Sequence, residues 1–128
     1  MLIRLDFKSE IPIYLQLRNQ IVLGIGRGAL QPGESLPTVR QLAQDAGVNA
    51  MTVSKAYTLL KKEGFISIDR RYGATVNGAR REDDAAESLE PQLELTVSEA
   101  GLRGISEDEF LALCKKVYSK MDGLKNQT

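Results

Sequence analysis

The sequence contains no histidine, no tryptophan and a single cysteine among its 128 residues. Without histidine, neither a Ser-His-Asp nor a Cys-His catalytic arrangement can form, and metal sites with histidine ligands are excluded. One cysteine allows no intrachain disulfide, which suits a reducing cytoplasm, and Cys114 lies on an apolar helical face that favours buried packing over redox sensing. We therefore expect a cytoplasmic protein that is not an enzyme and has no metal and no cofactor.

Long apolar runs are also absent. No stretch approaches the roughly 18 continuous apolar residues that span a bilayer, and residues 1–6 lack the features of a secretory signal peptide. We expect no membrane as a partner. Hydrophobic residues make up 42% of the chain, which is enough for the core of one domain, or of one small domain with an appendage.

Opposite charges are concentrated in the two halves of the chain, although the formal net charge is zero. Residues 1–81 hold 12 Lys and Arg against 6 Asp and Glu, a net charge of +6, whereas residues 82–128 hold 5 against 11, a net charge of −6. A basic segment suits a polyanion such as nucleic acid, and an acidic segment is repelled by it. Acidic helices are also simply soluble, so the split supports this interpretation without proving it.

Two helical patterns separated by a turn occupy residues 36–64. Gly47 lies where the first helix must stop, because glycine tolerates the left-handed conformation that ends a helix, and Asn49 suits the N-cap of the second. A helix-turn-helix of this kind can place its second helix in the DNA major groove. Apolar residues at helical spacing form the inward faces: Val39, Leu42, Ala43 and Ala46, then Val53, Ala56, Tyr57 and Leu60.

The outward side of the second helix carries short polar groups that suit base edges, small apolar groups that suit a thymine methyl, and one cation for a phosphate. The alternative is the solvated face of an ordinary helical protein, because helix–glycine–helix patterns are common. The residues concerned are Asn49, Ala50, Met51, Thr52, Ser54, Lys55 and Thr58.

A β-hairpin is predicted directly after this helix. Residues 65–69 alternate apolar and polar side chains, residues 70–73 supply a turn, and residues 74–76 return as a second strand. A hairpin in this position is a wing, and Arg70 and Arg71 at its tip suit contact with phosphates or the minor groove. Alternatively, the two arginines only solubilise the turn.

Arg40 falls in the first turn of the first helix, after Thr38 as the predicted N-cap. A cation there opposes the helix dipole, so its position calls for an external reason, such as a DNA phosphate or a guanine edge. The alternative is an ion pair with Asp45 or Glu34.

Residues 11–76 resemble the winged-helix domain of GntR-family bacterial transcriptional regulators, and the short region after them resembles that of the YtrA-type subfamily. The resemblance implies a DNA operator as partner and a DNA contact by Arg40. The matching blocks are Pro12-Ile13-Tyr14 with Gln16, Gly28-x-Leu30-x-Pro32-Gly33, residues 36–43, residues 52–57, Gly64 and residues 70–76.

The DNA-contacting positions follow from the motifs and the resemblance together. Many relatives have an Arg-Gly-x-Gly-Thr wing tip, from which residues 71–75 depart, so the role of Tyr72 stays open between packing on a sugar and stabilising the hairpin. The predicted set is Thr38, Arg40, Asn49, Ala50, Met51, Thr52, Ser54, Lys55, Arg70, Arg71, Tyr72 and Gly73.

The segment before the helix-turn-helix is expected to support it. Residues 2–7 alternate apolar residues with Arg4 and Asp6, which indicates a short strand. A helix is then predicted from about Ile11, after Ser9, to Gly26 or Gly28. Its stripe of Tyr14, Leu17, Ile21 and Ile25 predicts core packing.

The C-terminal region is predicted to be helical and to dimerise, with a boundary that gives domains 1–80 and 81–128. One helix spans about residues 83–100, where Pro91 predicts a kink or a fresh start, and a capping box at residues 106–109 begins another. Two such helices cannot bury their apolar stripes on each other alone, so a second copy is expected to cover them; the alternative is packing on their own winged helix. The interface residues are Leu89, Leu93, Val97, Phe110, Leu113, Cys114, Val117 and Met121.

The fold class predicted is mainly α with a small β-hairpin wing: a winged helix-turn-helix followed by a helical dimerisation region. The predicted function is that of a sequence-specific transcriptional regulator, a repressor, which binds a pseudo-palindromic DNA operator as a homodimer. One alternative is a winged-helix module for protein assembly with an incidental basic surface. Another is a switch gated by an unknown small-molecule effector, although the tail is small for a roomy pocket.

Overall fold

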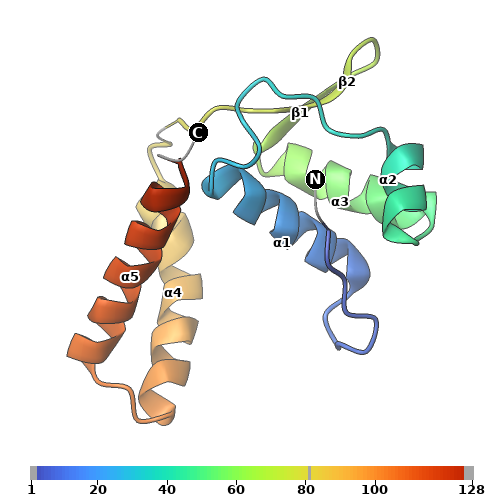
Figure 1. Ribbon diagram of the computed structural model, residues 1–128. Helices are drawn as coiled ribbons and strands as arrows, with labels where there is room; N and C mark the ends of the chain where they lie inside the picture. Colours follow the sequence, from blue (N-terminus) through green and yellow to red (C-terminus); the bar gives the residue numbers. More distant parts are fainter. Residues whose placement is uncertain (1–2, 81, 126–128) are drawn as a thin grey trace. The chain divides into compact units, whose positions relative to one another are not determined.

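The computed structural model describes residues 3–80 and 82–125, and these form two compact units that are divided along the chain between residues 78 and 79. The first unit contains helix α1 (Ile13–Gly26), helix α2 (Val39–Ala46), helix α3 (Ala50–Lys62), and strands β1 (Ile66–Asp69) and β2 (Gly73–Val76). The second contains helices α4 (Ala85–Leu102) and α5 (Glu107–Lys125). The predicted fold class, mainly helical with one hairpin, is confirmed (Figure 1).

The core of the first unit lies where the three helices meet the hairpin. Leu17 and Ile21 of α1 are fully buried together with Val53 and Leu60 of α3 and Ile66 of β1. Burial of each such side chain contributes about 1.5–3 kcal/mol relative to leaving it in water. The apolar stripes predicted for α1 and α3 therefore pack against each other in this core, and this contact fixes α3 against α1.

The helix-turn-helix forms as the sequence predicts. Gly47 ends α2 with φ 71° and ψ 35°, and its N–H donates to the carbonyl of Ala43. Asn49 begins α3, its side chain accepting from the N–H of Thr52 at 2.8 Å. A β-carbon at the left-handed Gly47 would strain the turn, because L-residues with side chains rarely adopt positive φ.

The start of the chain differs from the prediction. Residues 3–6 form no strand, and Leu2 lies outside the described residues. The N–H groups of Arg4 and Asp6 donate instead to the side chains of Gln20 and Gln16 on α1, each at 2.8 Å. Glutamine side chains on a helix thus take the place of a partner strand, which alternation alone could not reveal.

Helix α1 begins at Ile13, two residues after the predicted start at about Ile11. Pro12 stands at the N-cap in an extended conformation, with φ −54° and ψ 143°. The residue before a proline is disfavoured in helical conformation, so the helix cannot include Ile11. Ser9 does not cap α1; its hydroxyl accepts from the N–H of Ile11 at 3.1 Å.

The hairpin is a three-residue connection between two antiparallel strands, with Asp69 opposite Gly73 and Ile66 opposite Val76. The segment before α2 adds to this sheet, because Leu36 donates to the carbonyl of Ala74 and Val76 to that of Glu34, at 2.8 and 2.9 Å. The wing is therefore tied to the loop that precedes α2. Ile66 is the only buried residue of β1. Ile68 is 42% exposed, although the alternating pattern predicts that it is buried.

The second unit consists of two helices joined by a short turn at residues 103–106. Helix α4 runs without interruption through Pro91, so the predicted fresh start is wrong; the proline costs the hydrogen bond that its amide would have made within the helix. The capping box of α5 is confirmed, as Glu109 donates its N–H to the Ser106 hydroxyl at 3.2 Å. No helix in the described parts of the chain is long and apolar enough to cross a bilayer.

Tyr57 links the two helices of the helix-turn-helix to the preceding loop. Its hydroxyl donates to the carbonyl of Pro37 at 2.7 Å, just before the α2 N-cap, and its side chain is almost fully buried. Burial raises the pKa of Tyr57 from 10.0 to about 12, because the buried phenolate is disfavoured.

Replacement of Tyr57 by phenylalanine should lower the free energy of unfolding at neutral pH by about 1–2 kcal/mol, because the Pro37 carbonyl loses its donor. In the native protein the unfolding free energy should fall as pH rises from 10 to 12, because unfolded tyrosine ionises first while folded Tyr57 stays protonated. Tyr57→Phe should show a shallower fall than Tyr118→Phe, which alters a side chain 71% exposed on α5. Denaturant titrations at several pH values measure both; equal pH dependences of the two variants would contradict this role for Tyr57.

Candidate nucleic-acid interface

The N-terminus of α2 is built by a capping box that leaves Arg40 free. Thr38 accepts from the N–H of Gln41 at 3.1 Å, and the Gln41 side chain accepts from the N–H of Thr38 at 3.1 Å. Arg40 is exposed and makes no hydrogen bond or ion pair with any residue in the described ranges 3–80 and 82–125. The alternative ion pair with Asp45 or Glu34 is therefore not formed, and the guanidinium keeps all its donors for a partner.

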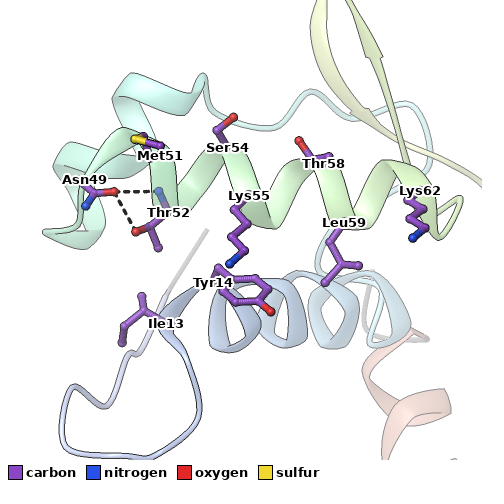
Figure 2. Close-up of a pocket in the computed structure, with 10 residues that line it drawn as sticks. All are labelled: Ile13, Tyr14, Asn49, Met51, Thr52, Ser54, Lys55, Thr58, Leu59 and Lys62. Carbon is purple, nitrogen blue, oxygen red and sulfur yellow. Dashed lines mark hydrogen bonds between the residues drawn. The ribbon is translucent and has the colours of Figure 1, made fainter.

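The N-terminus of α3 is shaped by Asn49 and Thr52. The Asn49 carbonyl oxygen accepts from both the N–H and the hydroxyl of Thr52, each at 2.8 Å (Figure 2). The amide NH₂ of Asn49 is thereby oriented but not consumed, so it remains a donor. Thr52 is half-buried, which leaves its oxygen chiefly as an acceptor.

The exposed and half-buried residues on the outer side of α3 fall into two stripes. Met51, Ser54 and Thr58 recur at helical spacing on one stripe, and Thr52, Lys55 and Leu59 recur on the other. Figure 2 shows Ser54 and Thr58 directed away from α1, whereas Lys55 and Leu59 point toward it. Met51 is 82% exposed at the first turn of the helix, although an apolar side chain gains little there from water.

A groove of about 850 Å³ is lined by residues of both stripes and by the start of α1. Across it, the Lys55 Nζ lies over the ring of Tyr14, 4.1 Å from the ring centroid. This is a cation–π contact, in which the negative face of the aromatic ring attracts the ammonium group. Ile13 lies beside Tyr14 on the α1 side of the groove.

The wing tip is ordered by Asp69 and exposes its basic side chains. The Asp69 carboxylate accepts from the N–H groups of Arg71 and Tyr72, at 2.6 and 3.3 Å, which fixes the turn. Gly73 closes the connection with φ 74°, a conformation that favours glycine. Arg70 and Arg71 are exposed, and Tyr72 is 74% exposed, so its ring does not stabilise the hairpin by packing.

The helix N-termini differ in charge between the two units. Helices α2 and α3 carry no acidic residue in the first turn, whereas α4 carries Glu87 and α5 carries Glu107, Asp108 and Glu109 there. Carboxylates near a helix N-terminus neutralise the partial positive charge of its free N–H groups. The helix-turn-helix therefore keeps two positive helix ends on its surface, in keeping with an anionic partner.

The structure brings the predicted DNA-contacting residues to the surface of the first unit, at the start of α2, the start of α3 and the wing. All are exposed except Thr52, which is half-buried. Their roles as contacts stay predictions. Sequence reasoning assigned Tyr14 only to the core, but it also faces Lys55; the Pro12-Ile13-Tyr14 block was the available signal.

The residues predicted to form the dimer interface leave apolar surface uncovered in the single chain. Leu89 and Leu93 of α4 are 61% and 52% exposed, and Val117 of α5 is 55% exposed. Cys114 is partly exposed and not buried, in contrast to the prediction from its apolar face. Among the described residues of the second unit only Ala100 is buried, so most of both apolar stripes stays open in the single chain.

A helix-turn-helix with free donors at the start of its second helix, followed by a basic hairpin, defines a winged-helix DNA-binding protein. Comparison with known protein families identifies the family to which the chain belongs. The model of the bacterial regulatory proteins of the gntR family matches residues 12–76, and the chain belongs to this family. Its members are transcriptional regulators and not enzymes, and the protein is a DNA-binding transcriptional regulator of this kind.

Relatives extend the likeness beyond the winged helix. The chain is 29% identical to the transcriptional repressor YtrA of Bacillus subtilis over 97% of this chain and 98% of YtrA. It is 41% identical to the transcriptional regulator Rv1152 of Mycobacterium tuberculosis over 59% of this chain, a match that spans 62% of Rv1152. The YtrA-like character predicted from the sequence is thus confirmed.

Solved structures are also similar to this one, and two of them bear on DNA binding. YtrA from Sulfolobus acidocaldarius, a GntR-family transcription factor, has a TM-score of 0.65 and 35% identity, over 78% of this chain and 97% of that one. The DNA-binding domain of AraR, solved in complex with operator ORX1, has a TM-score of 0.54 and 26% identity, over 59% of this chain and 98% of that one.

Proposed function

We propose that the protein binds a pseudo-palindromic DNA operator as a homodimer, with residues 1–80 as the DNA-binding domain and residues 81–128 as the dimerisation region. The observation that carries this proposal is the exposed guanidinium of Arg40, which has no hydrogen-bond or ion-pair partner among residues 3–80 and 82–125, together with the basic wing tip. The proposed contacts are Thr38, Arg40, Asn49, Ala50, Met51, Thr52, Ser54, Lys55, Arg70, Arg71, Tyr72 and Gly73.

Base readout is assigned to the groups that keep free hydrogen-bonding capacity. The Arg40 fork suits the O6 and N7 acceptors of a guanine, the Asn49 NH₂ is a directed donor, and Met51 presents an apolar surface to a thymine methyl. Arg70 and Arg71 are assigned to phosphates or the minor groove, because neither needs its charge for the hairpin itself. This assignment explains why the exposed surface of the first unit combines hydrogen-bond donors, apolar groups and cations.

Dimerisation is supported by the uncovered stripes of α4 and α5. Apolar side chains at helical spacing lose contact with water when a second copy packs against them, and a two-fold interface uses the same patch on both chains. A dimer holds two recognition helices for half-sites about one helical turn of DNA apart, roughly 34 Å. The acidic charge of this region disfavours its own contact with DNA.

We further propose that the protein acts as a repressor, as the name of its B. subtilis relative YtrA indicates for that protein. Occupation of an operator that overlaps a promoter excludes the polymerase by steric hindrance. A small-molecule effector is proposed to act by changing the spacing of the two DNA-binding heads, because the C-terminal region is short for a roomy pocket. A reducing cytoplasm fits both the DNA partner and the lone Cys114.

Salt dependence separates this function from a protein-assembly module with an incidental basic surface. DNA binding that neutralises several phosphates weakens steeply with salt, because condensed counterions are released on binding. Fluorescence anisotropy with a duplex, titrated at increasing salt, should give a slope that reflects several contacts. Weak binding with no sequence preference at moderate salt would contradict operator recognition.

Replacement of Lys55 by alanine should reduce the magnitude of this slope by about one unit for each protomer bound, because one phosphate contact is lost. Lys116→Ala is the matched control, as it removes an exposed lysine from α5 in the acidic region. Its slope should equal that of the native protein. A Lys55→Ala slope that also equals the native one would remove Lys55 from the phosphate contacts.

A further inference from the structure

We propose that Tyr14 is a positioning residue for DNA binding: its ring holds the Lys55 ammonium at the edge of the recognition helix, where a phosphate completes its coordination. This inference rests on the proposed DNA-binding function and goes beyond it, because Tyr14 is not itself assigned as a contact. It starts from a single geometric fact. The Lys55 Nζ lies 4.1 Å from the Tyr14 ring centroid.

The ring is held by a well-supported helix start. Tyr14 is the second residue of α1, directly after the extended Pro12 and Ile13. Gln16 fixes the chain before it, since its side chain donates to the carbonyls of Asp6 and Ile11 at 3.0 and 2.8 Å. The ring therefore sits on a rigid element that packs across α3, and not on a mobile loop.

Lys55 gains most from such a neighbour because its side chain is flexible. A lysine ammonium is a compact charge on a four-carbon stem that samples many rotamers in water. Contact with one face of a ring restricts those rotamers and still leaves N–H donors directed outward. Because the Lys55 side chain is already restricted, its binding to an anion costs less conformational entropy than the binding of a fully solvated lysine.

The position of Lys55 favours a phosphate over a base edge. Its side chain lies on the stripe of α3 that faces α1, whereas Met51 and Ser54 lie on the neighbouring stripe (Figure 2). When one stripe of a recognition helix enters the major groove, the flanking stripe faces the sugar–phosphate wall of that groove. Tyr14 thus keeps Lys55 on the flanking stripe, where it can contact a phosphate, and leaves the neighbouring stripe to the bases.

A double-mutant cycle with the full chain and an operator duplex tests the inference. Tyr14→Leu removes the π face at similar bulk, Tyr14→Phe keeps it, and Lys55→Gln removes the charge. In the native background, Tyr14→Leu should weaken binding about two- to fivefold per protomer and flatten the salt slope, whereas Tyr14→Phe should bind as the native protein does. In the Lys55→Gln background, Tyr14→Leu should have no further effect.

Two outcomes of this cycle would overturn the positioning role of Tyr14. Equal or tighter binding by Tyr14→Leu would mean that Lys55 leaves the ring on binding, and an equal loss in both Lys55 backgrounds would mean that Tyr14 acts by packing alone. If the native protein bound no duplex selectively, the proposed function itself would fail, which is a separate result.

A measurement on the native protein keeps the inference testable even if Tyr14→Leu does not fold. Nuclear Overhauser effects between the Lys55 ε-methylene and the Tyr14 ring protons should be present in the free protein and persist in the DNA complex. Their disappearance on DNA binding would overturn the positioning role, because the ring would then hold Lys55 only in the free state.

Discussion

Replacement of Val117 by glutamate is expected to split the dimer and to lower affinity for a two-half-site operator by about 10²–10⁴-fold, because linked binding of the second half-site is lost. Val117 is 55% exposed in the single chain, so the new carboxylate stays solvated in the monomer and costs the fold little. In a dimer the same carboxylate would be buried without a partner in an apolar interface, which is strongly unfavourable.

Ser119→Glu is the matched control for this variant. It adds the same charge two residues further along α5, on the opposite side of the helix from the predicted interface stripe. Sedimentation should give a monomer for Val117→Glu and a dimer for Ser119→Glu, and affinity for a single half-site should be the same in both. An unaltered sedimentation profile for Val117→Glu would refute the interface assignment.

Replacement of Arg40 by alanine should produce the second large effect, a loss of operator affinity of about 5–150-fold per half-site, equivalent to one bidentate base contact of about 1–3 kcal/mol. Thermal stability should not fall. Arg40 is exposed, has no partner among the residues that the structure describes, and opposes the dipole of α2. Anisotropy titrations and thermal melts of the same preparations separate the two effects.

Two further variants identify what Arg40 contacts. Arg40→Lys keeps the charge but loses the planar fork, so it should rescue a phosphate contact and fail to rescue a guanine contact. Arg27→Ala removes an exposed arginine from the C-terminal end of α1 and should leave affinity close to native. An Arg40→Ala variant that binds as tightly as Arg27→Ala would remove Arg40 from the contacts.

The helix-turn-helix could be predicted from sequence because its signals are local. The stripe of Val53 and Leu60 is set by helical periodicity alone, the left-handed turn by Gly47, and the cap by Asn49. Each of these signals acts within a few residues of chain. The hairpin followed for the same reason, since Asp69 and Gly73 supply its turn geometry.

The features that sequence reasoning missed depend on residues far apart in the chain. Residues 3–6 alternate like a strand, yet their amides are taken by Gln16 and Gln20, which periodicity does not record. The loop before α2 pairs with β2 through Leu36 and Ala74, and no turn signal announces that pairing. At the site, the approach of Lys55 to Tyr14 required knowledge of how α1 crosses α3.

We propose that cations and small polar groups of the first unit recognise a specific duplex when two chains are joined. Selection of bound fragments from a random DNA library by the purified full chain, at moderate ionic strength, tests it most directly. We expect enrichment of an inverted repeat whose half-sites lie about one helical turn apart. Recovery of fragments with no shared sequence, or of single sites without symmetry, would contradict it.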